Sequence, residues 1–354
     1  MKFKKYNSID NITNKTFEHF LSSDKYDKDT QWCVTEKVHG CNFSIYISIN
    51  GEVKAAKRSS FLGNWNSSSF YNYQKILDEY DFSQFKDYIK GLNESDKSVP
   101  QVDYIILYGE LCGGSYPETE ALSGIKMIQK EIYYSNDHEF VIYDIAFHYI
   151  HDLPHNYQID DYRFLEHRLV EYTCNSTGLH VLPSLFNGTL VKCLEWSKAN
   201  LDKQSGVWEM LGMKKEVENN IREGHVIKPS GDQIFLQGDR VIFKDKNIKF
   251  RENSGAKTEK KEVKELSIEL VKLSEIVDTY ICQNRFNNVI SKYGEYTIRD
   301  FGELLALMSI DIMEELSINT EEYNILDNLQ LNELNKIIRT KVSRYFVKNK
   351  KELF

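Results

Sequence analysis

The stretch TEKVHGCNFS, residues 35–44, groups the polar residues Lys37, His39, Gly40 and Asn42 between two apolar runs. The run QWCVTE before this group and the alternation of apolar and polar residues after it predict two β-strands. Lys37 would then lie in a short connection at the edge of a sheet. Because a strand end holds a side chain rigidly, this position suits a reactive lysine.

The second of these strands is predicted to continue into a hairpin. Three isoleucines, Ile45, Ile47 and Ile49, alternate with polar residues, and Asn50 and Gly51 follow directly. An Asn-Gly pair favours the tight turn of a β-hairpin. The run EVKAAKR after the turn is therefore predicted to be the antiparallel partner strand.

Further strands are predicted later in the chain, where short polar or glycine-rich groups end apolar runs. DYIILYGELCGG (103–114) and EFVIYDIAF (139–147) have the length and composition of buried strands. EGHVIKP (223–229) and DRVIFKDKNIKF (239–250) show strand-like alternation, whereas the segment from Tyr157 to Leu211 is predicted to contain mixed helical segments with few glycines. The first 250 residues are thus expected to form an α+β domain with antiparallel sheets.

The last third of the chain has a different pattern. A polar run near residues 252–262 reads as a linker, and apolar residues then recur at spacings of three and four, as at Leu270, Leu273 and Val277. We therefore expect a domain at residues 1–251, a linker at 252–262 and a small all-α domain at 263–354. A fragment that ends near Arg251 is expected to fold alone.

Composition sets limits on the function. The chain has 354 residues, a net charge of −8, and 41% hydrophobic and 28% charged residues, as in ordinary globular proteins. Its six cysteines form no CxxC pair, which argues against a zinc site and against a disulfide framework. Without a signal peptide or an apolar run of about 20 residues, we expect a cytoplasmic, soluble protein.

The polar groups at the strand ends are the candidate site. The sequence lacks the common nucleotide-binding and hydrolase motifs, so the polar groups at the strand ends are the remaining candidates for a functional site. A lysine nucleophile needs burial or neighbouring cations to lower its pKa. Lys244 and Lys246, two apart on a strand, would face Lys37 together while Asp245 points away. Taken singly, Lys37 would more often be a solvated loop lysine, and only the series of polar groups favours a reactive one.

Three carboxylates at strand ends, Glu110, Asp144 and Glu223, have two readings. Each could simply end a strand at the surface. If they converge, they could hold a divalent metal and hydrogen-bond a ribose, as an enzyme that handles a nucleoside triphosphate requires.

The order of the motifs EKVHGCN, AKR, YGEL, VIYDI, EGHVIKP and FKDK resembles the lysine nucleotidyltransferase superfamily, and within it the phage-type RNA ligase 2 branch. The histidine in the lysine motif and the segment YICQNRFNNVISKYGE resemble this branch in particular. The resemblance implies an ATP-grasp-like adenylyltransferase domain followed by an RNA-engaging helical domain. It implies an ATP-dependent RNA ligase that seals 3′-hydroxyl and 5′-phosphate ends, preferably at nicks in duplex RNA, through lysyl-AMP and RNA-adenylate intermediates.

The resemblance also implies roles for individual residues, with ATP and Mg²⁺ or Mn²⁺ as cofactors and a monomer acting on broken RNA. Lys37 would be the nucleophile, and Glu223 would assist it and bind the metal. Lys244 and Lys246 would complete the catalytic group. The residues expected to bind ATP are Glu36, Lys37, Asn42, Glu110, Tyr143, Lys228, Lys244 and Lys246. The residues expected at the RNA end are His39, Arg58 and Asp144, with Asn42 also near the nicked strand.

Two alternatives stay open at this point. The chain could be another member of the superfamily, such as a DNA ligase or an mRNA capping enzyme, or a non-catalytic nucleic-acid-binding relative. The helical tail argues against the first and the intact lysines against the second.

The last helix, from Lys336 to Lys351, carries seven basic residues and no acidic one. It is either an RNA-binding face that includes Lys341, Arg344 and Lys348, or a solvated helix surface.

Overall fold

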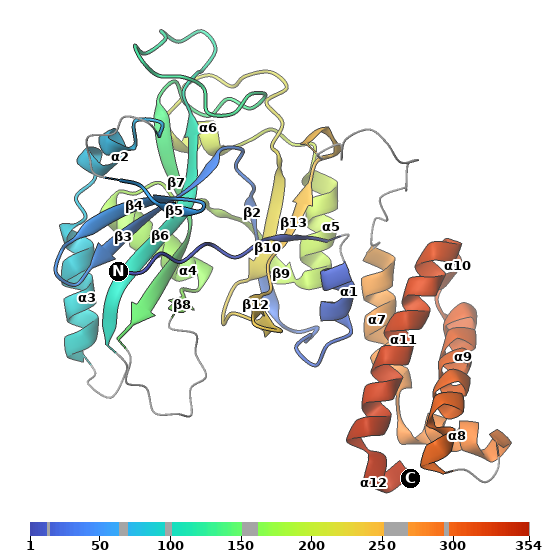
Figure 1. The fold of residues 1–354 in the computed structure, drawn as a ribbon. Coiled ribbons are helices and arrows are strands. Elements are labelled where there is room, and N and C mark those ends of the chain that lie inside the picture. Colours follow the sequence, from blue (N-terminus) through green and yellow to red (C-terminus); the bar gives the residue numbers. More distant parts are fainter. Residues whose placement is uncertain are drawn as a thin grey trace.

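The computed structural model (Figure 1) describes most of the chain as two groups of elements, an N-terminal part built on two sheets and a C-terminal part built of helices. The described residues are 1–12, 15–63, 70–95, 101–150, 162–250, 268–293 and 297–353. The expected linker at residues 252–262 and both domain boundaries beside it lie outside the described residues, so the division into domains stays a prediction.

The larger sheet contains the predicted hairpin. Its strand order is β5-β4-β3-β6-β7-β8, and every neighbouring pair is antiparallel. The turn at Gly51, whose φ is +82°, joins β3 to β4 as the Asn-Gly pair predicted. The strands are β3 (Cys41–Ser48), β4 (Val53–Lys57), β5 (Ser60–Phe61), β6 (Val102–Gly113), β7 (His138–Tyr149) and β8 (Tyr162–Phe164).

The second sheet has the order β1-β13-β10-β2-β9, antiparallel except for the β1–β13 pair. Strand β2 belongs to this sheet and β3 to the other, so the connection at residues 37–40 carries the chain from one sheet to the next. Its strands are β1 (Asp10–Asn11), β2 (Gln31–Glu36), β9 (Ser184–Thr189), β10 (Gly224–Pro229) and β13 (Phe243–Lys246). A separate hairpin joins β11 (Phe235–Leu236) to β12 (Asp239–Arg240).

Helices cover both sheets and close two hydrophobic cores. Helices α2 (Tyr73–Glu79), α3 (Ser83–Ser95) and α4 (His167–Thr177) pack on the six-stranded sheet around Phe43, Ile105 and their neighbours. Helix α5 (Leu190–Asn200) packs against β2, β9 and β10. The remaining helices of this part are α1 (Lys15–Leu21), α6 (Val207–Met210) and the 3₁₀ turn η1 (Ile248–Phe250).

Two expectations about secondary structure were wrong. Strand β9 lies inside the segment that was expected to contain mixed helical segments. It is an edge strand with several half-buried residues, so it lacks the buried apolar run that identifies a strand in a sequence. The run ending at Phe250 also leaves the extended conformation after Lys246 and ends in η1, where Phe250 is buried near His39.

The C-terminal part is helical, as the apolar spacing predicted. Buried residues at spacings of three and four, including Leu270, Leu273, Val277, Leu304 and Met308, form its interior. Its elements are α7 (Ile268–Tyr280), α8 (Gln283–Tyr293), η2 (Ile298–Asp300), α9 (Phe301–Asn319), α10 (Glu321–Asn324), α11 (Asn328–Lys348) and α12 (Lys350–Leu353). In the part of the chain that the structure describes, none of the helices combines the length and hydrophobicity that a bilayer crossing requires.

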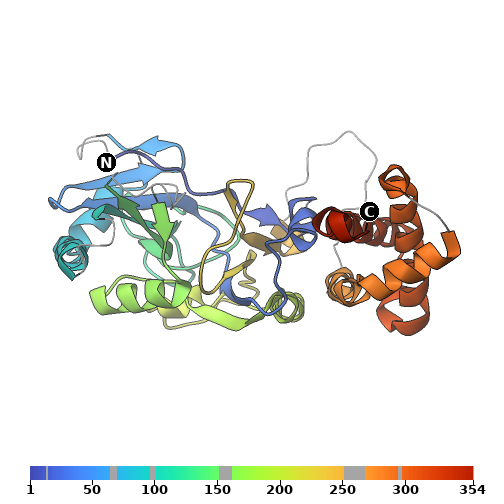
Figure 2. The same cartoon turned by 90° about the horizontal axis from the view of Figure 1, so that it is seen from below.

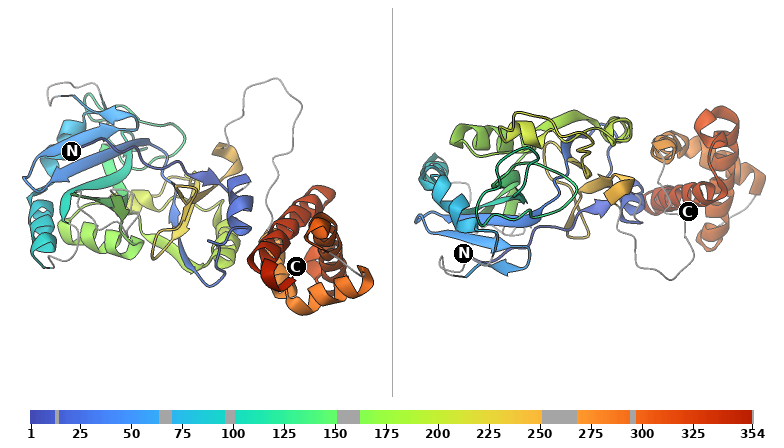
Figure 3. Two further views of the ribbon diagram at one scale, coloured as in Figure 1. Left: turned by 60° about the horizontal axis from the view of Figure 1, so that its bottom comes forward. Right: turned by 90° about the horizontal axis from the view of Figure 1, so that it is seen from above.

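The helical part lies beside α1 and α5, at the end of the molecule away from the six-stranded sheet (Figures 2 and 3). Helix α7 packs against α5, Lys272 pairs with Glu195 at 2.8 Å, and the hydroxyl of Tyr26 donates to Glu275. One hydrophobic cluster, which contains Trp32 and Leu270, continues across this contact. The two parts therefore share buried apolar surface in addition to these polar contacts.

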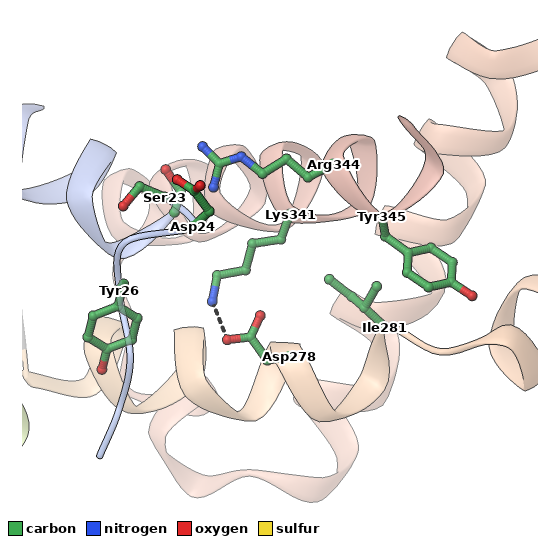
Figure 4. Close-up of a pocket in the computed structure, with 9 residues that line it drawn as sticks. Ser23, Asp24, Tyr26, Asp278, Ile281, Lys341, Arg344 and Tyr345 are labelled. Atoms are coloured by element: carbon green, nitrogen blue, oxygen red, sulfur yellow. Dashed lines mark hydrogen bonds and ion pairs between the residues drawn. The ribbon is translucent and has the colours of Figure 1, made fainter. Parts of the chain in front are cut away.

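The basic helix α11 differs from the expected RNA-binding face at one position. Lys341 is only 9% exposed, and its ammonium lies 2.6 Å from Asp278 (Figure 4). The same ammonium lies 2.9 Å from the carbonyl of Ser274. It lines a pocket of about 290 Å³ between the two parts, together with Tyr26 and Arg344. Lys341 is therefore a packing residue that ties α11 to α7, because its charge is already paired and turned inward.

Replacement of Lys341 by alanine should lower the free energy of unfolding by about 1–3 kcal/mol, because the hydrogen bonds from its charged ammonium to the carbonyl of Ser274 and to Asp278 are lost. Urea unfolding followed by circular dichroism measures the change. The control is Lys336→Ala, an exposed lysine on the same helix, which should change stability by about 0.5 kcal/mol or less. Equal stabilities of the two variants would contradict the buried role of Lys341.

Candidate functional site

The connection between the two sheets is held by close backbone contacts. The amide of Lys37 donates to the carbonyl of Gly224 at 2.9 Å, and the amide of His39 donates to the hydroxyl of Tyr134 at 2.9 Å. A Cβ atom at Gly40 would lie 2.1 Å from the carbonyl oxygen of Leu111, so only glycine fits there. These contacts fix Lys37 at the point where the sheets meet.

A pocket of about 770 Å³ opens at this point. Every site residue predicted from the sequence lines it, except Asp144. These residues come from both sheets: the five-stranded sheet contributes β2, β10 and β13, and the six-stranded sheet contributes β3, β6 and β7. The predicted residues that line the pocket are Glu36, Lys37, His39, Asn42, Arg58, Glu110, Tyr143, Glu223, Lys228, Lys244 and Lys246.

Glu223 is the centre of charge in the pocket. Its carboxylate lies 2.6 Å from the ammonium of Lys37, 3.0 Å from that of Lys246 and 3.4 Å from Nδ1 of His39. Burial alone would raise the pKa of Glu223, but the hydrogen bond from His39 and the charges and hydrogen bonds of the two lysines outweigh it and lower the pKa to about 2. Glu223 is therefore an anion that holds Lys37 in place.

The alternation predicted for β13 is confirmed. Lys244 and Lys246 line the pocket, whereas Asp245 is buried and accepts a hydrogen bond from Ser197 at 2.7 Å. Burial lowers the pKa of Lys244, and the nearby charges of Lys246 and Lys37 lower it further. Three lysine side chains thus gather beside one carboxylate, which leaves the site ready to bind an anion such as a polyphosphate.

Glu110, Asn42 and Tyr143 form another wall of the pocket. Asn42 lies opposite Glu110 in the β3–β6 register, and its amide donates to the hydroxyl of Tyr143. Burial raises the pKa of Glu110 to about 7; Lys37 opposes the rise, and Glu223 adds to it. Near neutral pH this wall therefore changes between a neutral and a charged carboxyl group.

Asp144 lies behind the pocket and does not open into it. It is fully buried, 2.8 Å from Lys228 and 2.7 Å from Arg240, and it accepts a hydrogen bond from Tyr6. Burial would raise its pKa, but the charges of Arg240 and Lys228 hold the pKa well below its usual range. The expected direct role at an RNA end is therefore corrected: Asp144 positions Lys228, which also donates to the carbonyl of Tyr143 at 2.7 Å.

Two other predicted site residues differ in burial. Glu36 is 3% exposed and accepts a hydrogen bond from the amide of Gly206 at 3.1 Å, so its carboxyl group is engaged by backbone. Burial raises its pKa despite this hydrogen bond. Arg58 is exposed and lines the pocket beyond the end of β4, where a large ligand could reach it.

A divalent metal ion in this pocket would have few protein side chains as ligands. Within the described ranges, no group of three or more His, Cys, Asp or Glu side chains could hold a metal ion. Mg²⁺ is usually held by one or two carboxylates together with substrate phosphates and water. Glu110 and Glu223, which both line the pocket, suit a metal that arrives with phosphates.

Sequence reasoning missed the N-terminal segment. Tyr6, Asn7, Ser8 and Ile9 line the pocket, and the segment crosses the six-stranded sheet before β1 (Figure 1). Hydroxyl groups of the sheet hold it in place. They belong to Tyr46 and Tyr108, which donate to the carbonyl of Lys4 at 3.0 and 2.9 Å, and to Tyr104, which accepts from the amide of Lys2 at 3.3 Å. The alternating tyrosines of β6 were the available signal, since buried hydroxyl groups need partners.

Replacement of Glu110 by glutamine should stabilise the protein at pH 8 and leave its stability unchanged near pH 4. The folded-state pKa of about 7 lies above the ordinary value of 4.5. The stability from the neutral carboxyl group is therefore present at low pH and is lost as the pH rises from 4.5 through 7. We expect a gain on the order of 2 kcal/mol at pH 8, measured by urea unfolding of both proteins from pH 4 to 8. An equal difference at every pH would contradict the raised pKa.

Comparisons with known proteins identify the family of this chain. The family model described as RNA ligase matches residues 30–246, more than half of the chain, and the model described as T4 RNA ligase 2 C-terminal matches residues 263–344. RNA-editing ligase 2, mitochondrial, of Trypanosoma brucei brucei is 24% identical to this chain over an alignment of 367 positions. The alignment covers 90% of this chain and 84% of that protein.

Other similar proteins share a smaller part of their length with this chain. RNA-editing ligase 1, mitochondrial, of the same organism is 28% identical over 223 residues, 56% of this chain and 44% of that protein. A structure of a Naegleria gruberi RNA ligase with PPi has a TM-score of 0.42 and 16% identity, and the match covers 70% of this chain and 57% of that one. On the strength of the two family models, the chain belongs to the RNA ligase family, and it is an RNA ligase with a C-terminal region of the T4 RNA ligase 2 type.

Proposed function

We propose that this RNA ligase uses ATP to join a 3′-hydroxyl to a 5′-phosphate, preferably at a nick in duplex RNA, through an adenylate on Lys37. The observation that supports this most strongly is the position of Lys37. Its amine opens into the pocket 2.6 Å from Glu223, and Lys228, Lys244 and Lys246 line the same pocket. Such a group of cations around an amine suits the transfer of a nucleotidyl group from a triphosphate.

In the first step the ammonium of Lys37 gives one proton to solvent, and the neutral amine attacks the α-phosphorus of ATP. A nitrogen–phosphorus bond forms as the bond to the bridging oxygen breaks; pyrophosphate leaves with the electron pair, and the nitrogen loses its second proton to the pyrophosphate or to solvent. Negative charge spreads over the phosphate oxygens in this transition state, so fixed positive charges lower its energy. Lys244 and Lys246 would supply those charges, and Glu223 would keep the amine in line. A bound Mg²⁺ or Mn²⁺ would add further positive charge at the phosphates.

The nucleoside would lie on the wall opposite these lysines. Tyr143 presents a half-buried ring that could stack on adenine, and Glu110 could accept a hydrogen bond from the ribose. Lys228, fixed by Asp144 and by the carbonyl of Tyr143, would hold a phosphate. Asn42 is tied to Tyr143 and would support this wall.

In the later steps the RNA enters from the open side of the pocket. An oxygen of the RNA 5′-phosphate forms a bond to the phosphorus of AMP as the nitrogen–phosphorus bond breaks, and Lys37 leaves as a protonated amine. The 3′-hydroxyl then loses its proton to solvent and attacks the 5′-phosphate, and AMP leaves as the new phosphodiester forms. Arg58 is exposed at the pocket and could bind the 5′-phosphate by a bidentate contact. His39, which is paired with Glu223, lies close enough to Lys37 to contact the same end.

A monomer and a cytoplasmic location complete the proposal. Neither follows from the relatives, which are described as mitochondrial.

Replacement of Lys37 by alanine should abolish covalent labelling by ATP carrying a radioactive α-phosphate, because the variant lacks the nucleophile. Denaturing electrophoresis after incubation with Mg²⁺ measures the label, and circular dichroism checks the fold. The control is Lys54→Ala, a partly exposed lysine on β4 outside the pocket, which should label as the unchanged protein does. Labelling of the Lys37 variant at the normal rate would rule out this nucleophile, and labelling from GTP in place of ATP would rule out the proposed nucleotide.

The preference for nicked duplex RNA is expected to depend on exposed basic residues of the C-terminal region. Lys336, Arg339 and Lys348 on α11 are exposed, unlike Lys341. Reversal of these three to glutamate should weaken the sealing of a nicked duplex but spare labelling by ATP. The salt dependence of RNA binding should flatten by nearly one unit of log–log slope for each RNA phosphate that the variant no longer neutralises.

A matched control for this reversal changes three exposed basic residues elsewhere, Lys90, Arg168 and Lys198, to glutamate. It alters the net charge equally, so any general electrostatic effect appears in both proteins. If both triple variants seal nicks equally well across a salt series, the exposed residues of α11 do not bind RNA.

A further inference from the structure

The back of the five-stranded sheet contains a buried polar chain that the proposed chemistry does not use. Asp245 lies between the pocket residues Lys244 and Lys246 but points to the opposite face, toward α5. His225 on β10 is its direct cross-strand neighbour. Ser197 on α5 lies against both side chains.

The hydrogen bonds of this chain run in one direction. Arg222 lies 3.1 Å from Nε2 of His225, Nδ1 of His225 lies 2.8 Å from the hydroxyl of Ser197, and this hydroxyl lies 2.7 Å from Asp245. A guanidinium group only donates, so Nε2 accepts and Nδ1 carries the proton. His225 therefore donates to Ser197, and Ser197 donates to Asp245.

The surroundings hold this arrangement in a single state. Ser197 and His225 are fully buried, and Arg222 and Asp245 are 8% and 7% exposed. Because Arg222 can only donate, its contact with Nε2 requires this nitrogen to be unprotonated, so the imidazole is neutral in this arrangement. A neutral ring with its proton on Nδ1 is the form that the chain of donors requires.

The group differs from a hydrolytic triad in order and in access. In such a triad the histidine lies between the serine and the carboxylate, whereas here Ser197 lies between His225 and Asp245. Ser197 has no exposed surface for a substrate. What the group can do is fix the orientation of Asp245, and with it the strand that carries the two lysines.

Strand β13 needs such an anchor because it is short. It has four residues, and on one side its neighbour is the two-residue strand β1. Lysine side chains are long and flexible, so their positions depend on a fixed backbone. A backbone shift of about 1 Å is enough to slow a positioned reaction by up to about a hundredfold.

We propose that Ser197 is a positioning residue for the transfer of AMP to Lys37: through Asp245 it fixes β13 so that Lys244 and Lys246 meet the phosphates. Arg222 and His225 set the direction of its hydroxyl proton. This inference rests on the proposed function, since it assigns the lysines of β13 to the α-phosphate transfer.

The test compares single-turnover labelling of Lys37 by ATP in Ser197→Ala and in the unchanged protein over a range of ATP concentrations. We expect the maximal rate to fall at least about tenfold, with a smaller change in the half-saturating concentration. The matched control is Ser309→Ala, another buried helical serine, whose hydroxyl donates to the carbonyl of Leu305 in the C-terminal part. It should label at the normal rate.

Two further variants separate positioning from a loss of fold. Asp245→Asn keeps an acceptor for Ser197 and should retain most of the maximal rate, whereas Asp245→Ala should lose it as Ser197→Ala does. Ser197→Cys keeps the core filled with a weaker donor and should also be slow. If Ser197→Ala or the cysteine variant folds and labels at the normal rate, or if the asparagine variant is as slow as the alanine variant, the inference is overturned.

Failure of this inference is distinguishable from failure of the proposed function. If the unchanged protein takes no label on Lys37, the proposed function itself fails. If it does and the variants match it, only the role of Ser197 is overturned.

Discussion

A single buried carboxylate, that of Asp144, ties the two sheets together behind the pocket. It projects from the six-stranded sheet and meets Lys228 of the five-stranded sheet and Arg240 of the small hairpin. Removing one partner of a buried ion pair costs about 3–5 kcal/mol, because the other charge is left without compensation. Two cations and the hydroxyl of Tyr6 offset the desolvation of Asp144, and the same contacts fix Lys228 at the pocket.

The pocket in front of Asp144 contains more positively charged than negatively charged side chains. Glu223 is shared by Lys37 and Lys246, while Lys244 and Lys228 add further positive charge and Glu110 is partly neutral near pH 7. A site with an excess of fixed cations favours an anionic ligand and then stabilises the charge that develops during phosphoryl chemistry. The overall charge of −8 gives no indication of this local excess.

Contacts of helix α5 connect the pocket with the C-terminal helices. Helix α5 holds Asp245 through Ser197 on its inner side, and Glu195 of the same helix pairs with Lys272 of α7. Trp196 of α5 stacks on Phe186 at a centroid distance of 5.7 Å. The helix that supports the lysines of β13 is thus also the helix against which the C-terminal part packs.

The sequence alone determined the elements whose signals are local. The alternation around Ile45, the Asn-Gly turn at Gly51 and the spacing of Leu270 predicted the hairpin and the helices correctly, because side-chain periodicity reflects which face of an element is buried. The alternation on β13 likewise predicted that Lys244 and Lys246 share a face. The order of the motifs also grouped eleven residues that line one pocket.

Only the tertiary structure decided which side chains are buried and which charges are paired. Asp144 and Lys341 look like exposed charges in the sequence, yet each is buried against opposite charges from distant segments. The edge strand β9 and the Arg222–His225–Ser197–Asp245 chain leave no local pattern either, because they exist only once separate strands and helices meet. The N-terminal wall around Tyr6 leaves a signal only in the distant tyrosines of β6. Burial and pairing are properties of the assembled fold, and a linear pattern cannot contain them.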